Sequence, residues 1–191
     1  MKILAIGASN NSNSINRTLA VYAAGLVEGA EVEVLDIQGY EMPLYSDERE
    51  QRFGQPLQAR NFFKKIGGAD ALVISFAEHN GSYTAAWKNL FDWTSRIDIK
   101  VFQGKPTVYL ATSPGPGGAR SVLAAAEGSA PFFGADLVGS LSIPGFHSVF
   151  DNEQGRLHDE ITAKRLRLLM AKLEERLQEE NWSRHKAKSG D

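Results

Sequence analysis

The sequence predicts an α/β fold, a three-layer sandwich in which helices cover both faces of a five-stranded parallel sheet. Short apolar runs alternate strictly with segments of helical periodicity along the chain. Three of these runs, ILAI, ALVIS and TVYLA, are almost continuously apolar, as expected for parallel strands that are buried on both faces. The chain length of 191 residues suits one domain with a sizeable core, so we expect a single domain over residues 1–180 and a flexible polar tail over 181–191.

The predicted strands are the β-type runs Lys2–Gly7, Glu31–Ile37, Ala71–Phe76, Thr107–Thr112 and Leu137–Ile143. The second run, EVEVLDI, alternates charge with valine, which is typical of a strand at the edge of a sheet. Five strands with the second one at an edge match the flavodoxin-like order 2-1-3-4-5. In that order, a ligand binds at the carboxyl ends of the strands, where the loops after the first, third and fourth strands should meet.

The predicted helices are the periodic segments Asn16–Glu28, Leu57–Ile66, Ala85–Ile97, Ala119–Ala130 and Asp159–Glu180. In the third segment, Trp87, Leu90, Phe91 and Thr94 recur at the spacing of one helix face. We expect this face to pack against the sheet or against a partner subunit rather than to stack on a ligand.

The composition narrows the possible partners. A formal net charge of −2 provides no field for nucleic acid or an anionic membrane, and no run approaches the ~18 apolar residues of a membrane span. There is no cysteine, which excludes disulfides and thiolate chemistry. The four histidines, His79, His147, His158 and His185, are far apart in the sequence, so we expect no metal site. A cytoplasmic protein without a nucleic-acid or membrane partner is expected.

The loop after the first strand, ASNNSNSINR, is rich in hydroxyl and amide groups and precedes a helix. Such a helix N-terminus binds anions, and phosphate in particular. The loop lacks both G-x-G-x-x-G and G-x-x-x-x-G-K-[ST], so a terminal monophosphate fits better than a pyrophosphate or a nucleoside triphosphate. Asp36 could mimic the acidic ribose ligand of a dinucleotide site, but a strand-to-loop role is favoured without the glycine loop. The alternative for Ser14 or Asn16 is that of a simple helix N-cap.

Two further loops should reach the same edge of the sheet. After the third strand, AEHNGS contains the turn Asn80–Gly81, and His79 in this loop is equally compatible with ligand contact and with a surface position. After the fourth strand, TSPGPGGAR offers a glycine-rich backbone that can lie close to a flat ring. Three polar loops at one edge indicate a ligand with a phosphate and a planar group.

The segments GASNNSNSINRTLA, AEHNGSYTAAWKNLFDW and SPGPGGAR resemble, in order and spacing, three motifs of the NADPH-dependent FMN reductase family. The resemblance runs from the first strand to about residue 120 and continues more loosely afterwards. It implies a flavodoxin-like fold, non-covalent FMN as cofactor, and NADPH or NADH as co-substrate. It also implies electron transfer to a small-molecule acceptor such as a flavin or quinone, by hydride transfer to flavin N5, with no catalytic side chain and no metal.

Position in these motifs implies three groups of cofactor-binding residues. The phosphate would be held by Ser9, Asn11, Ser14, Ile15 and Asn16. The flavin ring would be bordered by Ala77, Glu78, His79, Asn80 and the adjoining Gly81, and its pyrimidine edge would be covered by Ser113, Pro114, Gly115 and Gly117.

Three positions depart from the family's motifs. Asn11 stands where the family usually has arginine, Ala77 replaces a proline, and His79 replaces a tyrosine. Arg17 could compensate in part for the lost cation or could face solvent. We therefore expect these positions to affect the affinity for FMN and the choice of nicotinamide and acceptor.

The resemblance further implies a homodimer or homotetramer, for which Trp87, Phe91, Phe132 and Phe133 offer aromatic side chains on the helices that flank the expected site. Two other functions remain open. One is a flavodoxin-type electron carrier or partner-binding flavoprotein, although the nearly balanced charge argues against an acidic docking face. The other is a binding module that has lost the flavin.

Overall fold

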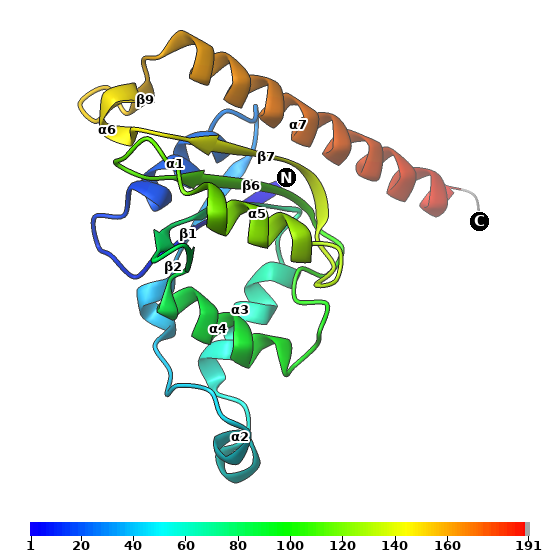
Figure 1. The fold of residues 1–191 in the computed structure, drawn as a ribbon. Coiled ribbons are helices and arrows are strands. Elements are labelled where there is room, and N and C mark those ends of the chain that lie inside the picture. The colour runs from blue at the N-terminus through cyan, green and yellow to red at the C-terminus, as the bar shows by residue number, and fades with distance from the viewer. Residues whose placement is uncertain (190–191) are drawn as a thin grey trace.

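A computed structural model describes residues 1–189 of the chain (Figure 1). Its central sheet has five parallel strands in the order β2-β1-β3-β6-β7, which confirms the predicted order 2-1-3-4-5. The strands are β1 (Lys2–Ala8), β2 (Glu31–Asp36), β3 (Ala71–Phe76), β6 (Pro106–Thr112) and β7 (Asp136–Ile143). Every residue of β3 and β6 is buried, whereas the edge strand β2 exposes Glu31, Val34 and Asp36.

Helices cover both faces of this sheet, as Figure 1 shows. One face is covered by α1 (Ile15–Ala24) and α7 (Glu160–Ser189), and the other by α3 (Leu57–Gly67), α4 (Ala85–Ser95) and α5 (Arg120–Ser129). Each face has its own hydrophobic core. Leu19 and Leu166 are buried on the first face, and Phe62, Trp87 and Val122 on the second. Burial of Trp87, Leu90 and Thr94 confirms that α4 packs on the sheet through the predicted face.

Two helix ends differ from the prediction by more than two residues. α1 ends at Ala24 and not at Glu28, because Gly25 is its C-cap and Leu26 turns back to bond the Ala23 carbonyl. α7 continues past Glu180 to Ser189, and the sequence has no glycine or proline in this stretch that would end the helix. Residues 190 and 191, the end of the 181–191 tail that we expected to be flexible, lie outside the described residues.

Several short elements were not predicted. They are η1 (Ile37–Tyr40), α2 (Asp47–Phe53), the hairpin of β4 (Glu78–His79) and β5 (Ser82–Tyr83), α6 (Phe146–Val149), and the hairpin of β8 (Phe150–Asp151) and β9 (Arg156–Leu157). α2 buries none of its residues and projects from one end of the body in Figure 1. Each of these elements is too short to produce a periodic pattern in the sequence.

Gly7 sets the position of α1 relative to β1. A Cβ atom at Gly7 would lie 2.6 Å from the Cα and the backbone nitrogen of Arg17. The first turn of α1 therefore packs directly on the strand backbone, which no residue with a side chain would allow. This close approach places the loop of residues 9–14 over the carboxyl end of β1.

Candidate functional site

A cavity of about 370 Å³ opens where the carboxyl ends of β1, β3 and β6 meet. We call it the loop cavity. Its lining comes from the three predicted loops and from α6: Ser9, Asn11, Asn13, Ser14, Ile15, Asn16, Ala77, Glu78, His79, Thr112, Ser113, Pro114 and His147. The expectation that the loops after the first, third and fourth strands meet is thus confirmed. The volume lies in the ordinary range for small-molecule and cofactor sites.

Four of the residues named from the motifs do not line this cavity. Asn80 and Gly81 form the exposed turn of the β4–β5 hairpin, with φ values of 53° and 76°. The Gly115 carbonyl accepts a hydrogen bond from the Gly145 N–H (3.0 Å), and the Gly117 carbonyl accepts one from Arg120 Nε (3.0 Å). These four residues belong to the loops around the cavity but lie outside its lining.

Three lining residues were missed by the sequence analysis, namely Asn13, Thr112 and His147. α6 brings His147 to the cavity because the Phe146 N–H donates to the Ser113 carbonyl at 3.0 Å. The sequence contained a signal for His147, because PGFH directly follows the fifth predicted strand and therefore lies at the same edge of the sheet. His79 and His147 therefore share one cavity although they are far apart in the sequence.

The start of α1 offers a set of hydrogen-bond donors to an anion. Ser14 is the N-cap, and its Oγ accepts from the Arg17 N–H at 3.2 Å. Ser9 Oγ accepts from the Asn11 N–H at 3.2 Å. Each hydroxyl keeps its own proton as a donor. The backbone N–H groups of Ile15 and Asn16 have no acceptor within residues 1–189 and stand at the positive end of the helix dipole.

The Asn16 side chain is committed to the floor of the site. Its Oδ1 accepts from Ser75 Oγ (2.7 Å) and from the Thr112 N–H (3.1 Å), and its Nδ2 donates to the Thr112 carbonyl (3.1 Å). The residue is only 3% exposed. Asn16 can therefore contribute its backbone N–H to a bound anion, while its side chain joins α1 to β3 and β6.

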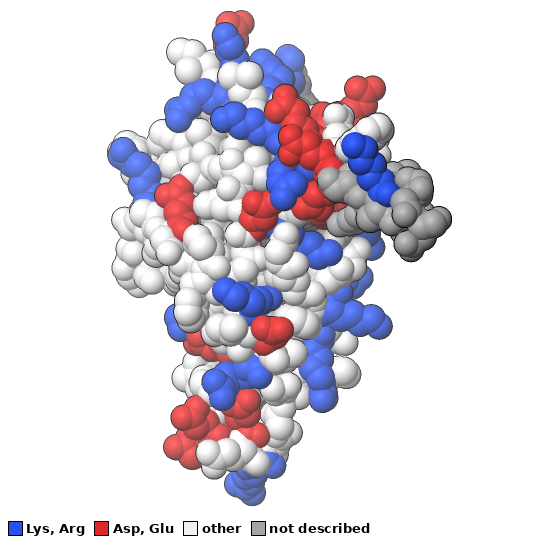
Figure 2. Space-filling model, turned by 90° about the vertical axis from the view of Figure 1, so that its right-hand side faces the viewer, with Lys and Arg blue, Asp and Glu red and all other residues white. Residues whose placement is uncertain are grey.

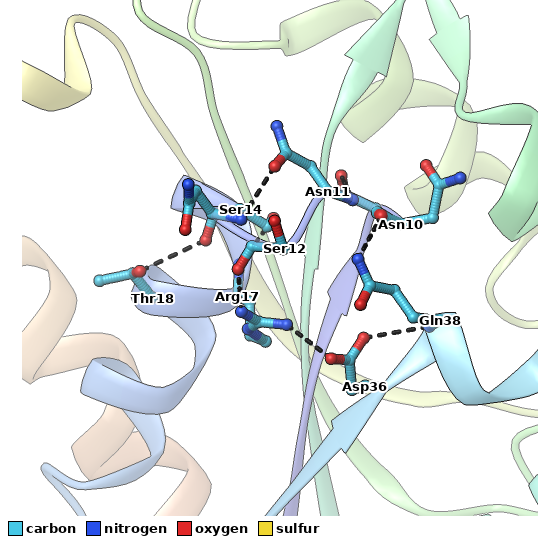
Figure 3. Close-up of polar contacts among 10 residues, drawn as sticks. Asn10, Asn11, Ser12, Ser14, Arg17, Thr18, Asp36 and Gln38 are labelled. Carbon is cyan, nitrogen blue, oxygen red and sulfur yellow. Dashed lines mark hydrogen bonds and ion pairs between the residues drawn. The ribbon is translucent and has the colours of Figure 1, made fainter.

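Figure 3 shows how the loop of residues 9–14 is braced from the end of β2. Arg17 Nη1 lies 2.8 Å from Asp36 Oδ2, and the Arg17 guanidinium also donates to the Ser12 carbonyl. Gln38 Nε2 donates to the Asn10 carbonyl at 2.7 Å, and Asp36 Oδ1 accepts from the Gln38 N–H at 3.0 Å. Asp36 therefore has the favoured strand-to-loop role, and Arg17 holds the loop instead of lining the cavity or facing solvent freely.

The β4–β5 hairpin is tied to α5 through Glu78. Its Oε2 accepts a hydrogen bond from the Val122 N–H at 2.9 Å. The N-cap residue of α5 is Ala119, which has a φ of 55° and no capping side chain. Glu78 thus supplies the missing cap from another element, and its negative charge lies at the favourable end of the helix dipole.

The glycine-rich loop is held in place at Gly118. This residue has a φ of 61°, and a Cβ atom there would lie 2.4 Å from Ser142 Oγ. Ser142 Oγ donates to the Gly118 carbonyl at 2.7 Å. Only glycine satisfies both the positive φ and this close approach, so the loop after β6 is fixed against β7.

The lining contains Glu78 and two histidines but no lysine or arginine. An anion in the loop cavity would therefore be held by backbone N–H groups and hydroxyls rather than by a cationic side chain. Within residues 1–189, no cluster of three or more His, Asp or Glu side chains could hold a metal ion.

A family model described as NADPH-dependent FMN reductase matches residues 1–147. These residues contain all three of the loops that form the loop cavity. The chain belongs to the NADPH-dependent FMN reductase family.

Curated relatives of this family member include two bacterial enzymes. An NAD(P)H-dependent FMN reductase of Pseudomonas aeruginosa is 37% identical over 116 residues, which cover 60% of this chain and 61% of the relative. A 2-hydroxy-1,4-benzoquinone reductase of a Burkholderia species is 36% identical over 117 residues, covering 60% of this chain and 62% of the relative. The chain thus spans about three-fifths of the length of these relatives.

Solved structures extend the similarity over most of the chain. FerB of Paracoccus denitrificans, a flavoenzyme NAD(P)H:(acceptor) oxidoreductase, superposes with a TM-score of 0.73 at 25% identity, over 93% of this chain and 97% of FerB. An FMN-dependent NADH-azoreductase of Bacillus anthracis, solved with FMN, has a TM-score of 0.62 at 14% identity, over 91% of this chain and 100% of the azoreductase. The azoreductase shares the fold of this reductase-family chain.

The three departures from the family's motifs all lie in the loop cavity of this FMN reductase family member. Asn11, Ala77 and His79 are among its lining residues. They therefore alter the surface that a ligand would contact, rather than a distant part of the fold.

Proposed function

We propose that the chain is an NAD(P)H-dependent oxidoreductase that binds FMN without a covalent bond and passes electrons from NADPH or NADH to a small acceptor such as a flavin or quinone. The observation that carries the proposal is the set of unused donors at the start of α1. They are the hydroxyls of Ser9 and Ser14 and the backbone N–H groups of Ile15 and Asn16. The FMN reductase and quinone reductase names of the relatives support the same assignment.

The donor set fits the phosphate of FMN. A terminal monophosphate has several free oxygens, and the hydroxyls and backbone N–H groups can satisfy them together. The loops after β3 and β6 would flank the flat ring, with Ala77, Glu78 and His79 on one side and Ser113 and Pro114 on the other. The proposed role of four further residues is to shape these loops: Asn80, Gly81, Gly115 and Gly117.

When bound, FMN would supply the redox chemistry, hydride transfer at N5, that links the nicotinamide to the acceptor. The protein's part is to bind, orient and shield. The Asn16 network fixes the floor of the site, and the Glu78–Val122 hydrogen bond fixes the hairpin relative to the glycine-rich loop. We expect no side-chain acid or base to be needed for the hydride step.

Rapid mixing tests the proposal. Protein loaded with FMN is mixed without oxygen with NADPH or NADH, and the visible flavin absorbance is followed. We expect one of the nicotinamides to bleach the flavin rapidly, and added FMN or quinone to restore the colour. The oxidised nicotinamide is the control and should bleach nothing. Absence of bleaching with both reduced nicotinamides would contradict the proposal and favour an electron carrier.

The charge distribution favours the enzyme over the carrier. Figure 2 shows acidic and basic residues interspersed on one face, without the continuous acidic field that would dock an electron-transfer partner. Near the lower end of this view, where α2 lies, both signs occur together. The sequence of α2 contains three acidic residues, Asp47, Glu48 and Glu50, and the basic residues Arg49 and Arg52.

A homodimer or homotetramer in the cytoplasm is the finer part of the proposal. Trp87 offers little surface to an interface, because it is only 2% exposed. We had expected Phe132 and Phe133 on a helix beside the site, but both follow the end of α5. Phe132 is 61% exposed. Sedimentation should show an oligomer at micromolar concentration, and a monomer would contradict the oligomeric assignment.

Cell fractionation should recover the protein with cytoplasmic markers, and a membrane-bound pool would contradict the cytoplasmic assignment. No helix within residues 1–189 has the length and apolar character needed to cross a bilayer.

A further inference from the structure

A second cavity, of about 220 Å³, lies between α4 and α5 and shares no lining residue with the loop cavity. We call it the aromatic cavity. Its lining includes the aromatic rings of Phe76, Trp87, Phe91 and Phe133. The one lysine and one aspartate in its lining, Lys88 and Asp92, pair with each other and leave no net charge.

The rings of the aromatic cavity hold one another at fixed angles. Phe76 lies edge-on to Trp87, with centroids 5.6 Å apart, and to Tyr109, at 5.1 Å. Phe91 and Phe133 are edge-on at 4.7 Å. Interlocked rings in this arrangement resist collapse into the space between them. A dry apolar cavity of about 150 Å³ accommodates benzene, so the aromatic cavity has room for one substituted ring or two fused rings.

The Tyr109 hydroxyl gives this apolar space one unused polar group. Tyr109 is 1% exposed, and the structure gives its hydroxyl no hydrogen-bond partner among residues 1–189. Among the described residues, every fully enclosed side-chain N or O atom has a hydrogen-bond partner. Because the Tyr109 hydroxyl has none, it must border open space, and the aromatic cavity provides that space. A ligand oxygen placed there would satisfy the hydroxyl.

The protonation of both cavity phenols favours donation to such an oxygen. Burial raises the pKa of Tyr109, and burial likewise raises the pKa of Tyr83, the other phenol in the lining. Both phenols therefore remain neutral over the physiological range. Tyr83 already forms a hydrogen bond with Ser129, so Tyr109 is the phenol whose O–H can be donated to a ligand. An uncharged ligand suits this site, because the dry aromatic walls would penalise an ion.

We propose that the aromatic cavity is a second ligand site, for an uncharged planar molecule of one or two aromatic rings that carries a hydroxyl or carbonyl oxygen. The β4–β5 hairpin separates this site from the first. Tyr83 lines the aromatic cavity, while Glu78 and His79, its neighbours on the same hairpin, line the loop cavity. The inference stands whether or not the loop cavity binds FMN.

Calorimetric titration of the full chain with 2-naphthol tests the site, and naphthalene, which lacks the oxygen, is the matched probe. We expect saturable binding of both, tighter for 2-naphthol, with the flavin content unchanged. Tyr109→Phe should weaken 2-naphthol binding about three- to tenfold and leave naphthalene unchanged, since one hydrogen bond is lost. Ala126→Leu should abolish both by filling the cavity, because Ala126 is buried in its wall.

Ala124→Leu on the exposed face of the same helix is the control for the filling variant and should bind both probes normally. Unfolding midpoints show whether each variant is folded. The proposal is overturned if neither probe shows saturable binding, or if Tyr109→Phe and Ala126→Leu both bind the probes like the wild type. It is also overturned if the probes displace flavin, or if they bind only when the protein is diluted to a monomer, which would assign the cavity to a second copy of the chain.

Discussion

Asn16 and Thr112 are joined by a pair of hydrogen bonds, each 3.1 Å long, between the Asn16 side-chain amide and both polar groups of the Thr112 backbone. This pair connects the first turn of α1 to the end of β6. Because Asn16 Oδ1 also accepts from Ser75 Oγ, three elements meet in one buried side chain. The position of α1 at the floor of the loop cavity is therefore fixed by this side chain.

Replacing Asn16 by alanine should destabilise the fold. The change leaves the Ser75 hydroxyl and both Thr112 backbone groups without partners in a buried place, and we expect a loss of about 2–4 kcal/mol in the free energy of unfolding. Urea unfolding measures it. Asn13→Ala, at an exposed position of the same loop, should change the free energy by less than about 0.5 kcal/mol. Equal effects of the two variants would contradict the role of Asn16.

Gly7→Ala and Gly128→Ala should have opposite effects on stability. At Gly7 the added Cβ would lie 2.6 Å from the Arg17 backbone, so α1 must move, and we expect a loss of about 2 kcal/mol or more. At Gly128, within α5, the Cβ meets nothing within 4 Å, and the gain in helix propensity should stabilise the protein by about 0.5–1 kcal/mol. Thermal unfolding of both variants measures these changes. A Gly7→Ala variant as stable as the wild type would contradict the close approach of α1 to β1.

Glu78→Ala should loosen the contact between the hairpin and α5. It removes the acceptor of the Val122 N–H, which we expect to cost about 1–2 kcal/mol and to weaken FMN binding several-fold. Glu78→Gln keeps an acceptor oxygen and should retain affinity within about twofold. Fluorescence titration with FMN compares the two. If glutamine is as harmful as alanine, the carboxylate acts through its charge and not as the cap.

The start of α7 should make stability depend on pH. Hydrogen bonds from Thr162, from its side chain first and then its backbone, hold the pKa of Asp159 below its ordinary value of 3.8. A carboxyl with a lowered folded pKa stabilises the protein fully above 3.8 and loses this contribution as the pH falls through the folded value. Urea unfolding from about pH 6 to pH 3 should therefore show a steeper loss for the wild type than for Asp159→Asn. Parallel curves would refute this linkage.

The sheet could be predicted because its strands carry the strongest local signal. Ala71–Phe76 is a strand with the predicted ends, since an apolar run that is buried on both faces has no other stable arrangement. The flavodoxin-like order followed from the alternating charges of β2, which the structure confirms as an edge strand. The ends of α1 and α7 were predicted less well, because Gly25 stops α1 early and no glycine or proline stops α7 before Ser189.

The site was predicted in outline but not in its individual roles. The rule that loops at the carboxyl ends of parallel strands meet brought Ser9, Ser14 and His79 into one cavity. It could not show that the Asn16 side chain points into a buried network, or that Arg17 pairs with Asp36, because those contacts join α1 to strands that are far from it in the sequence. They depend on tertiary distances that a linear pattern does not contain.

The most direct test of the phosphate site is the affinity of Ser14→Asp for FMN and for riboflavin, which lacks the phosphate. Aspartate is as good an N-cap as serine, so α1 should stay intact while a negative charge opposes the phosphate. Ser46→Asp, at the N-cap of α2, is the matched control. The account predicts that Ser14→Asp weakens FMN about a hundredfold or more and riboflavin less than about threefold, with Ser46→Asp unchanged. FMN affinity equal to the wild type, or an equal loss for FMN and riboflavin, would contradict it.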